Sequence, residues 1–270
     1  MKRDMHKSFT IIALAFLFLF NGCSKVPITN RKQVHLLSAS EMNSLGLTQY
    51  QETLKQSKVV NGTPDAQLVN KVGLNISNAA IQLMKQLNQS DRIAGFQWEY
   101  HLLESKEVNA WCLPGGKIAV YTGLLPITKD EAGLAVVMGH EVGHALAEHG
   151  NERMSQQLLA EMGGMALDVA LANEPSQTRS LYGQAYGLGA QYGALLPFSR
   201  AQESEADKIG LVLMAVAGYD PNNAVGLWER MKQLSAGNAP PEFMSTHPSD
   251  QHRIDDIKAF MPEAMKYYKK

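Results

Sequence analysis

The feature that most constrains this chain is the motif His140-Glu141-Val142-Gly143-His144, which lies in a helix-like run over residues 131–148. Two residues four positions apart on an α-helix project from the same face, separated by about 6 Å of rise. The two imidazoles can therefore share one zinc ion, and the Glu141 carboxylate can take a proton from an attacking water. The spacing predicts a helix that carries two zinc ligands and a general base.

The sequence around the motif supports this helix. Thr128 and Glu131 have the spacing of a capping box, which predicts that the helix begins there. No proline interrupts residues 131–152, and apolar residues recur with helical spacing at Leu134, Val137, Met138, Val142 and Ala145. The motif therefore lies in the middle of a helix, as a zinc site of this type requires.

A catalytic zinc ion usually takes three protein ligands, so a third ligand is expected elsewhere. His149 has the wrong spacing for the extended motif and is interpreted as a surface or outer-shell residue. Glu203 is the better candidate, and Asp207 on the same helix face can accept the free N–H of a ligating histidine. Glu205 lies about 200° around that helix and is a poor ligand. The alternative is a solvated acidic helix N-terminus, which the helix dipole favours.

The chain resembles the HtpX and CAAX-prenyl-protease family of zinc metalloendopeptidases, a group of gluzincins. The resemblance rests on the order and spacing of residues 26–33, 109–116, 140–144, 199–207 and 245–253. It is strongest for bacterial periplasmic lipoprotein members and extends to the related mitochondrial inner-membrane protease. It implies one zinc ion per chain, with Glu203 as the third ligand beside His140 and His144. Asn30 departs from the family pattern, which often has glycine there.

The remaining elements predict an α+β fold. N-cap residues and helical spacing indicate helices over residues 38–54 and from Thr63 onward. Alternating apolar residues predict strands over residues 95–103, 108–113 and 117–122, and helices follow to the end. We expect a mainly helical, zincin-type metalloprotease domain with a small β-sheet before the active-site helix.

The strand near residues 109–113 is the expected place for a substrate. An extended peptide can add to a sheet edge through main-chain hydrogen bonds, and Asn109 and Ala110 are the candidates for the substrate-facing rim. An interior hairpin is the alternative. Cys112 is interpreted as a small core residue rather than a nucleophile, because no basic group flanks it closely.

Residues 162–196 are rich in glycine and alanine, which allows helices to pack closely. Charged and amide side chains interrupt every apolar run in this segment, so we predict no membrane span there. Close packing is favoured over the alternative of a mobile lid.

His247 lies on a loop between prolines, which limits the freedom of its backbone. In the family that the chain resembles, this segment lies close to the zinc ion. Neutral His247 could cap the open zinc position and keep the enzyme latent. As an N–H donor it could instead stabilise the tetrahedral oxyanion, together with Arg253. A helix-capping surface histidine is the third interpretation.

The N-terminus predicts a processing segment. A basic start precedes an apolar run over residues 9–20, which is too short for a comfortable membrane span. Small residues before Cys23 resemble a lipobox, so residues 1–22 are interpreted as a lipoprotein signal peptide with acylation at Cys23. Residues 23–37 would be a lipid-anchored linker and residues 38–270 the peptidase domain. Phe20 departs from the usual leucine, and an uncleaved signal anchor is the alternative.

Composition limits the classes of function. A chain of 270 residues can hold one sizeable domain, and 45% hydrophobic residues exclude a disordered chain. The net charge of −1 gives no electrostatic support for a nucleic-acid partner.

The sequence therefore predicts a zinc metalloendopeptidase at the periplasmic face of a bacterial membrane, the outer membrane, as a lipoprotein. The resemblance implies misfolded or stalled outer-membrane proteins as substrates, with the outer-membrane assembly machinery as a further partner. The alternative is a non-catalytic, chaperone-like lipoprotein with a structural metal site. Glu141 argues against this alternative, because a structural site needs no general base.

Overall fold

The computed structural model describes residues 23–191, 196–235, 242–248 and 251–269. The strands are β1 (Cys23–Lys25), β2 (Lys32–Val34), β3 (Val59–Val60), β4 (Glu99–Leu103), β5 (Ala110–Leu113) and β6 (Lys117–Tyr121). The α-helices are α2 (Ala39–Gln56), α3 (Pro64–Gln86), α4 (Leu125–Thr128), α5 (Glu131–Leu146), α6 (His149–Ala170), α7 (Ser176–Ala190), α8 (Leu196–Val216), α9 (Asn223–Ser235), α10 (Glu242–Thr246) and α11 (Gln251–Ala264). The predicted α+β, mainly helical class is confirmed.

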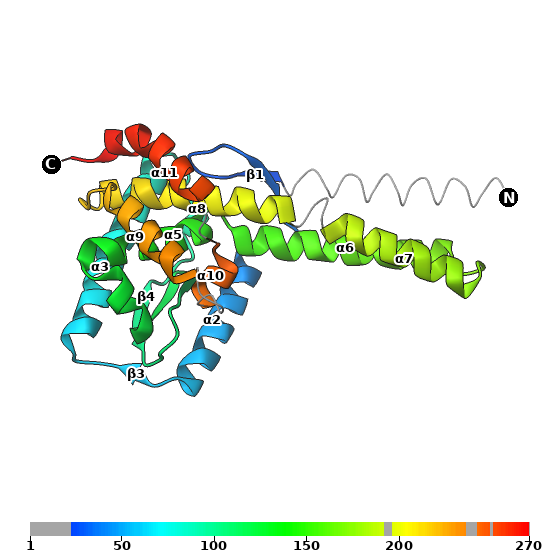
Figure 1. Ribbon diagram of the computed structural model, residues 1–270, viewed down its shortest axis with the longest axis horizontal. Helices are drawn as coiled ribbons and strands as arrows, with labels where there is room; N and C mark the ends of the chain where they lie inside the picture. The colour runs from blue at the N-terminus through cyan, green and yellow to red at the C-terminus, as the bar shows by residue number, and fades with distance from the viewer. Residues whose placement is uncertain (1–22, 192–195, 236–241, 249–250, 270) are drawn as a thin grey trace.

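Helix α5 lies at the centre, between α8 on one side and the sheet on the other (Figure 1). The sheet has the order β3-β4-β6-β5, in which β4 and β6 run parallel and the other pairs are antiparallel. The tight turn between β5 and β6 requires Gly116, whose φ is +79° and whose added Cβ would lie 2.8 Å from the Trp98 ring. Strand β5 thus forms an edge of the sheet, next to α5.

The helix starts follow local capping chemistry. Ser38 caps α2 with a capping box and Thr63 caps α3 before Pro64, as predicted. The capping box predicted for α5 is wrong. Asp130 is its N-cap and accepts a hydrogen bond from the Gly133 amide at 2.8 Å. Thr128 is instead the last residue of α4. Aspartate caps a helix at least as well as threonine, and Asp130 stands directly before the first residue of α5.

Glycines bring α5 and α8 into backbone contact. A Cβ on Gly143 would lie 2.7 Å from the Ala206 carbonyl oxygen, and a Cβ on Gly210 would lie 2.9 Å from the backbone nitrogen of His140. Such distances leave no room for a side chain between the two backbones. The small residues therefore set the short separation at which acids on α8 can reach histidines on α5.

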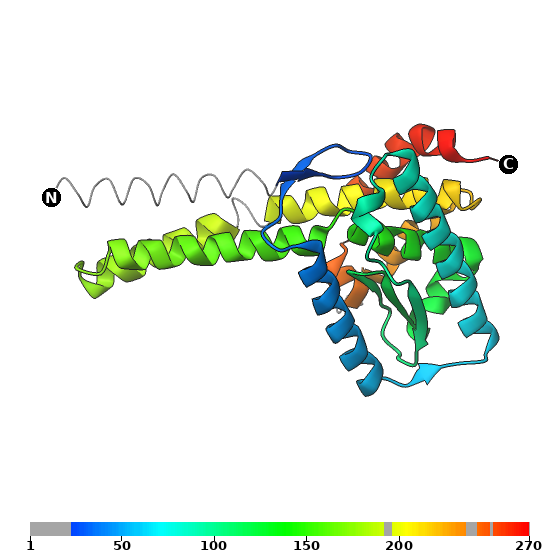
Figure 2. The same ribbon diagram turned by 180° about the vertical axis from the view of Figure 1, so that it is seen from behind.

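Helices α6 and α7 form a hairpin that projects away from the rest of the protein (Figure 1; Figure 2). The Tyr186 hydroxyl donates to the Ala160 carbonyl at 2.8 Å, and a Cβ on Gly163 would lie 2.1 Å from that hydroxyl. The predicted close packing of this glycine-rich segment is confirmed where α6 meets α7. Across the described parts of the chain, no helix is both long enough and apolar enough to cross a membrane.

Residues 23–37, interpreted as a linker from the sequence, contain an antiparallel hairpin of β1 and β2 that lies along α8 (Figure 1; Figure 2). Val26 is fully buried in the core, so this segment packs as part of the domain. Asn30 has a φ of +56°, the left-handed region that glycine and asparagine tolerate best. Residues 1–22 lie outside the described residues, and cleavage and acylation at Cys23 stay predictions.

Candidate metal centre

Four side chains converge on one point: His140 and His144 from α5, Glu203 from α8, and His247 directly after α10. One ligand atom from each lies within 4.8 Å of all the others. The Nε2 atoms of His140 and His144 are 3.1 Å apart, and Glu203 oxygens lie 3.4 and 3.3 Å from them. The structure thus brings together the three ligands expected from the sequence.

This donor set fits zinc. Three ring nitrogens and a carboxylate oxygen are ligand types that Zn²⁺ binds, commonly with four donors. Both α5 histidines are buried. Burial lowers the pKa of His144 well below its usual value, which keeps the ring neutral. Burial and Arg253 oppose protonation of His140, but hydrogen bonds to Asp207 and Glu203 raise its pKa to about 9, so this ring must lose a proton when a metal binds. Burial would raise the pKa of Glu203, but hydrogen bonds from the three histidines hold it far below the ordinary range. Neutral imidazoles and an ionised carboxylate are the forms that coordinate a metal.

Asp207 supports His140 from behind. Its Oδ1 accepts a hydrogen bond from His140 Nδ1 at 2.9 Å, as predicted from the shared helix face. Arg253 donates to both oxygens of Asp207 at 2.8 Å, and its guanidinium lies 3.4 Å from the centre of the Trp228 ring. This arrangement directs the other ring nitrogen of His140, Nε2, towards the cluster.

Glu141 has the surroundings of a general base. It is 4% exposed, and its Oε1 has no hydrogen-bond partner among the described residues. That oxygen lies 3.6 Å from His247 Nε2, at the border of the cluster. Burial raises the pKa of Glu141 above its usual value, which brings the carboxylate closer to the basicity that a proton acceptor needs at neutral pH.

The surface interpretation of His149 is wrong, and its outer-shell alternative fits the structure. His149 is fully buried, and its Nδ1 lies 2.9 Å from His144 Nδ1. Its Nε2 lies 3.1 Å from Glu205, which Arg31 of the N-terminal hairpin also contacts. Helix α5 ends at Leu146 and α6 starts anew after Glu148, whose φ is +55°. This unpredicted break turns His149 back towards the metal cluster.

His247 and Arg253 occupy different places. The surface interpretation of His247 is wrong, because its Nδ1 lies 3.0 Å from Glu203 and 3.2 Å from His140 Nε2. Arg253 donates to Asp207 and to the carbonyls of His247 and Pro248, so it holds the loop that carries His247. The oxyanion role of Arg253 stays a prediction, while the structure indicates a positioning role.

The predicted substrate rim is an exposed sheet edge in part. The Asn109 carbonyl accepts from the Tyr121 amide, so in the alternating ladder the peptide groups of Ala110 and Cys112 point away from β6. The Ala110 side chain is buried and its amide donates to the Asn109 side chain at 2.9 Å. Cys112, a free and half-buried cysteine, is the more accessible point of the edge. Burial raises the pKa of its thiol, which disfavours a nucleophilic role.

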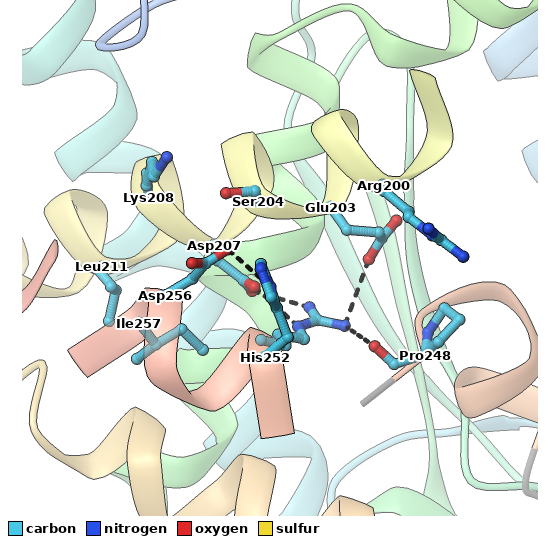
Figure 3. A pocket seen from close by; sticks show the side chains of 11 residues that line it. Arg200, Glu203, Ser204, Asp207, Lys208, Leu211, Pro248, His252, Asp256 and Ile257 are labelled. Carbon is cyan, nitrogen blue, oxygen red and sulfur yellow. Dashed lines mark hydrogen bonds and ion pairs between the residues drawn. The ribbon is translucent and has the colours of Figure 1, made fainter. Parts of the chain in front are cut away.

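Two cavities border the metal cluster. One of about 140 Å³ is lined by His144, by Cys112 and Leu113 of β5, and by residues of α2 and α6. The other, of about 480 Å³, lies between α8 and α11. Figure 3 shows Glu203 and Asp207 projecting into it from α8, with Pro248 on the far side. Each cavity is thus lined by one ligand of the cluster, His144 in the smaller and Glu203 in the larger.

The comparisons with known proteins agree with this geometry. The sequence model of peptidase family M48 matches residues 75–261. A mitochondrial metalloendopeptidase OMA1 of Schizosaccharomyces pombe is 35% identical, covering 94% of this chain and 71% of that protein. The zebrafish OMA1 is 32% identical, and the match covers 54% of its length. The beta-barrel assembly-enhancing protease of Escherichia coli is 28% identical over 60% of this chain and 34% of its own.

The predicted location is wrong by the same comparison. Three relatives that match over more than nine tenths of the chain are mitochondrial proteins, which contradicts a lipoprotein at the periplasmic face of a bacterial outer membrane. The special resemblance to periplasmic lipoprotein members is likewise not shown. A short apolar run before a cysteine is a weak pattern, because many N-terminal segments combine basic, apolar and small residues. Because the family match runs from α3 to α11 and includes every donor of the metal cluster, the chain is a zinc-dependent metallopeptidase that belongs to peptidase family M48.

Proposed function

We propose that this metalloendopeptidase cleaves unfolded or misassembled polypeptides that bind as an extended strand along β5. The observation that carries the proposal is the position of the β5 edge, since Cys112 and the metal ligand His144 line one cavity. A strand added to this edge would pass beside the cluster through main-chain hydrogen bonds, which make little demand on sequence. Only a segment free of its own tertiary structure can offer its backbone in this way.

The residues around the cluster account for the chemistry. Zinc, when held by His140, His144 and Glu203, supplies Lewis acidity towards the scissile carbonyl. Glu141 takes the proton of the attacking water and delivers it to the leaving amine. The unpartnered Glu141 oxygen supports this role over the chaperone-like alternative, because a structural metal site gains nothing from a buried base.

The names of relatives support a role in protein quality control. The Escherichia coli and Yersinia pestis relatives are called beta-barrel assembly-enhancing proteases, a name that links proteolysis to assembly. We extend to this chain only the removal of polypeptides that have failed to fold or assemble. We propose no outer-membrane setting, because the mitochondrial relatives contradict the location on which it depended.

The test compares one substrate protein in two states. The reduced, alkylated and unfolded form of a small disulfide-stabilised protein should be cleaved at least about tenfold faster than the native form, whose backbone is already paired. Cleavage is followed by gel and mass spectrometry, with chelator-treated enzyme as the control for zinc dependence. Equal rates on the two states would contradict the proposed substrate class, and activity that survives complete zinc removal would contradict the zinc mechanism.

Removing the backbone N–H of Cys112 tests whether the substrate adds to β5 as a strand. Proline at position 112 removes the outward-pointing N–H of β5, and proline is tolerated on a strand edge whose amide faces solvent. We expect Cys112→Pro to raise KM for an unfolded substrate by about tenfold, roughly the loss of one hydrogen bond to a partner strand. Cys112→Ala, which keeps the amide, is the matched control and should retain the wild-type KM. Equal KM values for the two variants would place the substrate elsewhere.

A further inference from the structure

The second ring nitrogen of His144 has a defined partner. His144 directs Nε2 towards the cluster, so metal binding requires that its proton sit on Nδ1. The atom within hydrogen-bond distance of this Nδ1 is Nδ1 of His149, at 2.9 Å. His149 must then accept through Nδ1 and carry its own proton on Nε2. Binding a metal at His144 therefore selects one tautomer for both rings.

The selected His149 tautomer finds an acceptor on the other side. Its Nε2 lies 3.1 Å from Glu205 Oε2. Glu205 is held in turn by the N-terminal hairpin, with Arg31 Nε at 2.8 Å and Nη2 at 2.9 Å and the Thr29 hydroxyl at 2.9 Å. Glu205 and His149 are 4% and 0% exposed, so water does not compete for these bonds.

The two histidine ligands are thus supported in different ways. His140 donates directly to a carboxylate, Asp207, at 2.9 Å. The Nδ1 atom of His144, which faces away from the cluster, is linked to a carboxylate through His149. That carboxylate belongs to Glu205, two positions before Asp207 on α8. Partners of this kind fix the tautomer and orientation of a ligating ring and raise its basicity, and their loss typically weakens metal binding 10–100-fold.

We propose that His149 and Glu205 are positioning residues for the metal ligand His144, and that the N-terminal hairpin, through Arg31, holds Glu205 in place. The hairpin is then a working part of the metal centre although it lies more than one hundred residues away in sequence. The inference rests on the proposed function insofar as zinc binds at His144. Glu205 is thus not a ligand, as the sequence predicts, but acts on one through His149.

Arg31 provides an internal control because it binds two carboxylates. Its guanidinium contacts Glu205 on α8 and Glu152 on α6, the latter at 2.6 and 2.7 Å. Both acids are almost fully buried, at 4% and 1% exposure. Glu205 also accepts a hydrogen bond from His149, whereas Glu152 accepts one from the Gln202 side-chain amide at 2.7 Å. Glu205→Gln and Glu152→Gln therefore remove equivalent ion pairs, and one of the two interrupts the connection to His144.

The test measures zinc dissociation constants by competition with a chromophoric chelator, together with unfolding midpoints in denaturant. We expect Glu205→Gln to bind zinc about tenfold more weakly and Glu152→Gln to stay within about twofold of wild type, at a similar loss of stability. His149→Ala should weaken binding by about 100-fold. His149→Asn should recover part of this loss, because its Oδ1 stands as many bonds from the backbone as the lost Nδ1. Equal affinities for the Glu205 and Glu152 variants, or for His149→Ala and wild type, would overturn the proposal.

The absorption spectrum of the metal site distinguishes a change in ligand geometry from a general loss of protein stability. The visible absorption of cobalt-substituted protein reports the geometry of the ligands. It should change in the His149→Ala and Glu205→Gln proteins and remain that of wild type in Glu152→Gln. Identical spectra in all four proteins would overturn the proposal. If the wild-type protein binds no zinc, the proposed metal function itself is contradicted. If the wild-type protein binds zinc and the Glu205→Gln protein binds it equally tightly, only the positioning role of Glu205 is contradicted.

Discussion

Glu141→Gln is expected to lower the rate of peptide-bond hydrolysis by about 10²–10⁴-fold while zinc remains bound. Glutamine keeps the shape of the side chain and can hydrogen-bond water, but it cannot accept the proton. The loss should appear in kcat rather than in KM, because Glu141 acts on the reacting groups and the β5 edge binds the substrate. Base and metal work as a unit, so adding a metal-ligand substitution to Glu141→Gln should cost little more than the larger single effect.

The measurement is single-turnover cleavage of an unfolded protein by enzyme with verified zinc content. Glu131→Gln is the matched control, since Glu131 begins the same helix and binds Lys71 and Tyr219 far from the cluster. It should cleave at nearly the wild-type rate. If Glu141→Gln cleaves like wild type with zinc in place, Glu141 is not the base. An inactive but folded variant would also retain substrates, which makes it suitable for trapping them in cell extracts.

The ligands were predictable because local rules place them. His140 and His144 are four residues apart on a helix whose apolar spacing is clear, and Glu203 and Asp207 repeat the same interval on α8. Helical geometry then decides which atoms share a face, so spacing indicated Glu203 and Asp207 as candidates. The histidine motif and the family resemblance favoured them over a solvated acidic helix N-terminus. The same reasoning correctly placed Glu205 on another face of α8, away from the metal.

The parts that sequence could not supply depend on contacts distant in the chain. No glycine or proline between Leu146 and His149 predicts the break between α5 and α6. At this break Glu148 adopts a φ of +55° and forms an ion pair with Arg92. Without that break, His149 would point along the continuing helix. The parallel pairing of β4 with β6 could not be predicted either, because the alternation of apolar residues in a strand does not show in which direction its neighbour runs. The resemblance of residues 26–33 to a family block was the one available sign that the hairpin matters.

The structure distinguishes between the roles that the sequence allows for His247. The sequence allows a latch on the metal position or a donor to the oxyanion. In the structure the His247 ring packs against the Phe243 ring, with 4.7 Å between centroids and a tilt of 33°. The His247 backbone amide donates to the Phe243 carbonyl at 2.8 Å. Its Nδ1 is the fourth donor of the cluster, the position that a catalytic zinc site leaves for water or substrate. This geometry favours the latch.

We therefore expect His247→Ala to raise the cleavage rate of a short peptide by roughly tenfold, because a site blocked most of the time binds substrate in proportion to its open fraction. A short peptide is chosen because it cannot displace the latch through extended contacts along β5. His252→Ala is the matched control, since that histidine follows in the next helix, is 83% exposed, and should leave the rate unchanged. A fall of about 10²–10³ would instead identify His247 as an oxyanion donor. An unchanged rate would exclude both roles and leave His247 as a side chain that fills space beside Phe243.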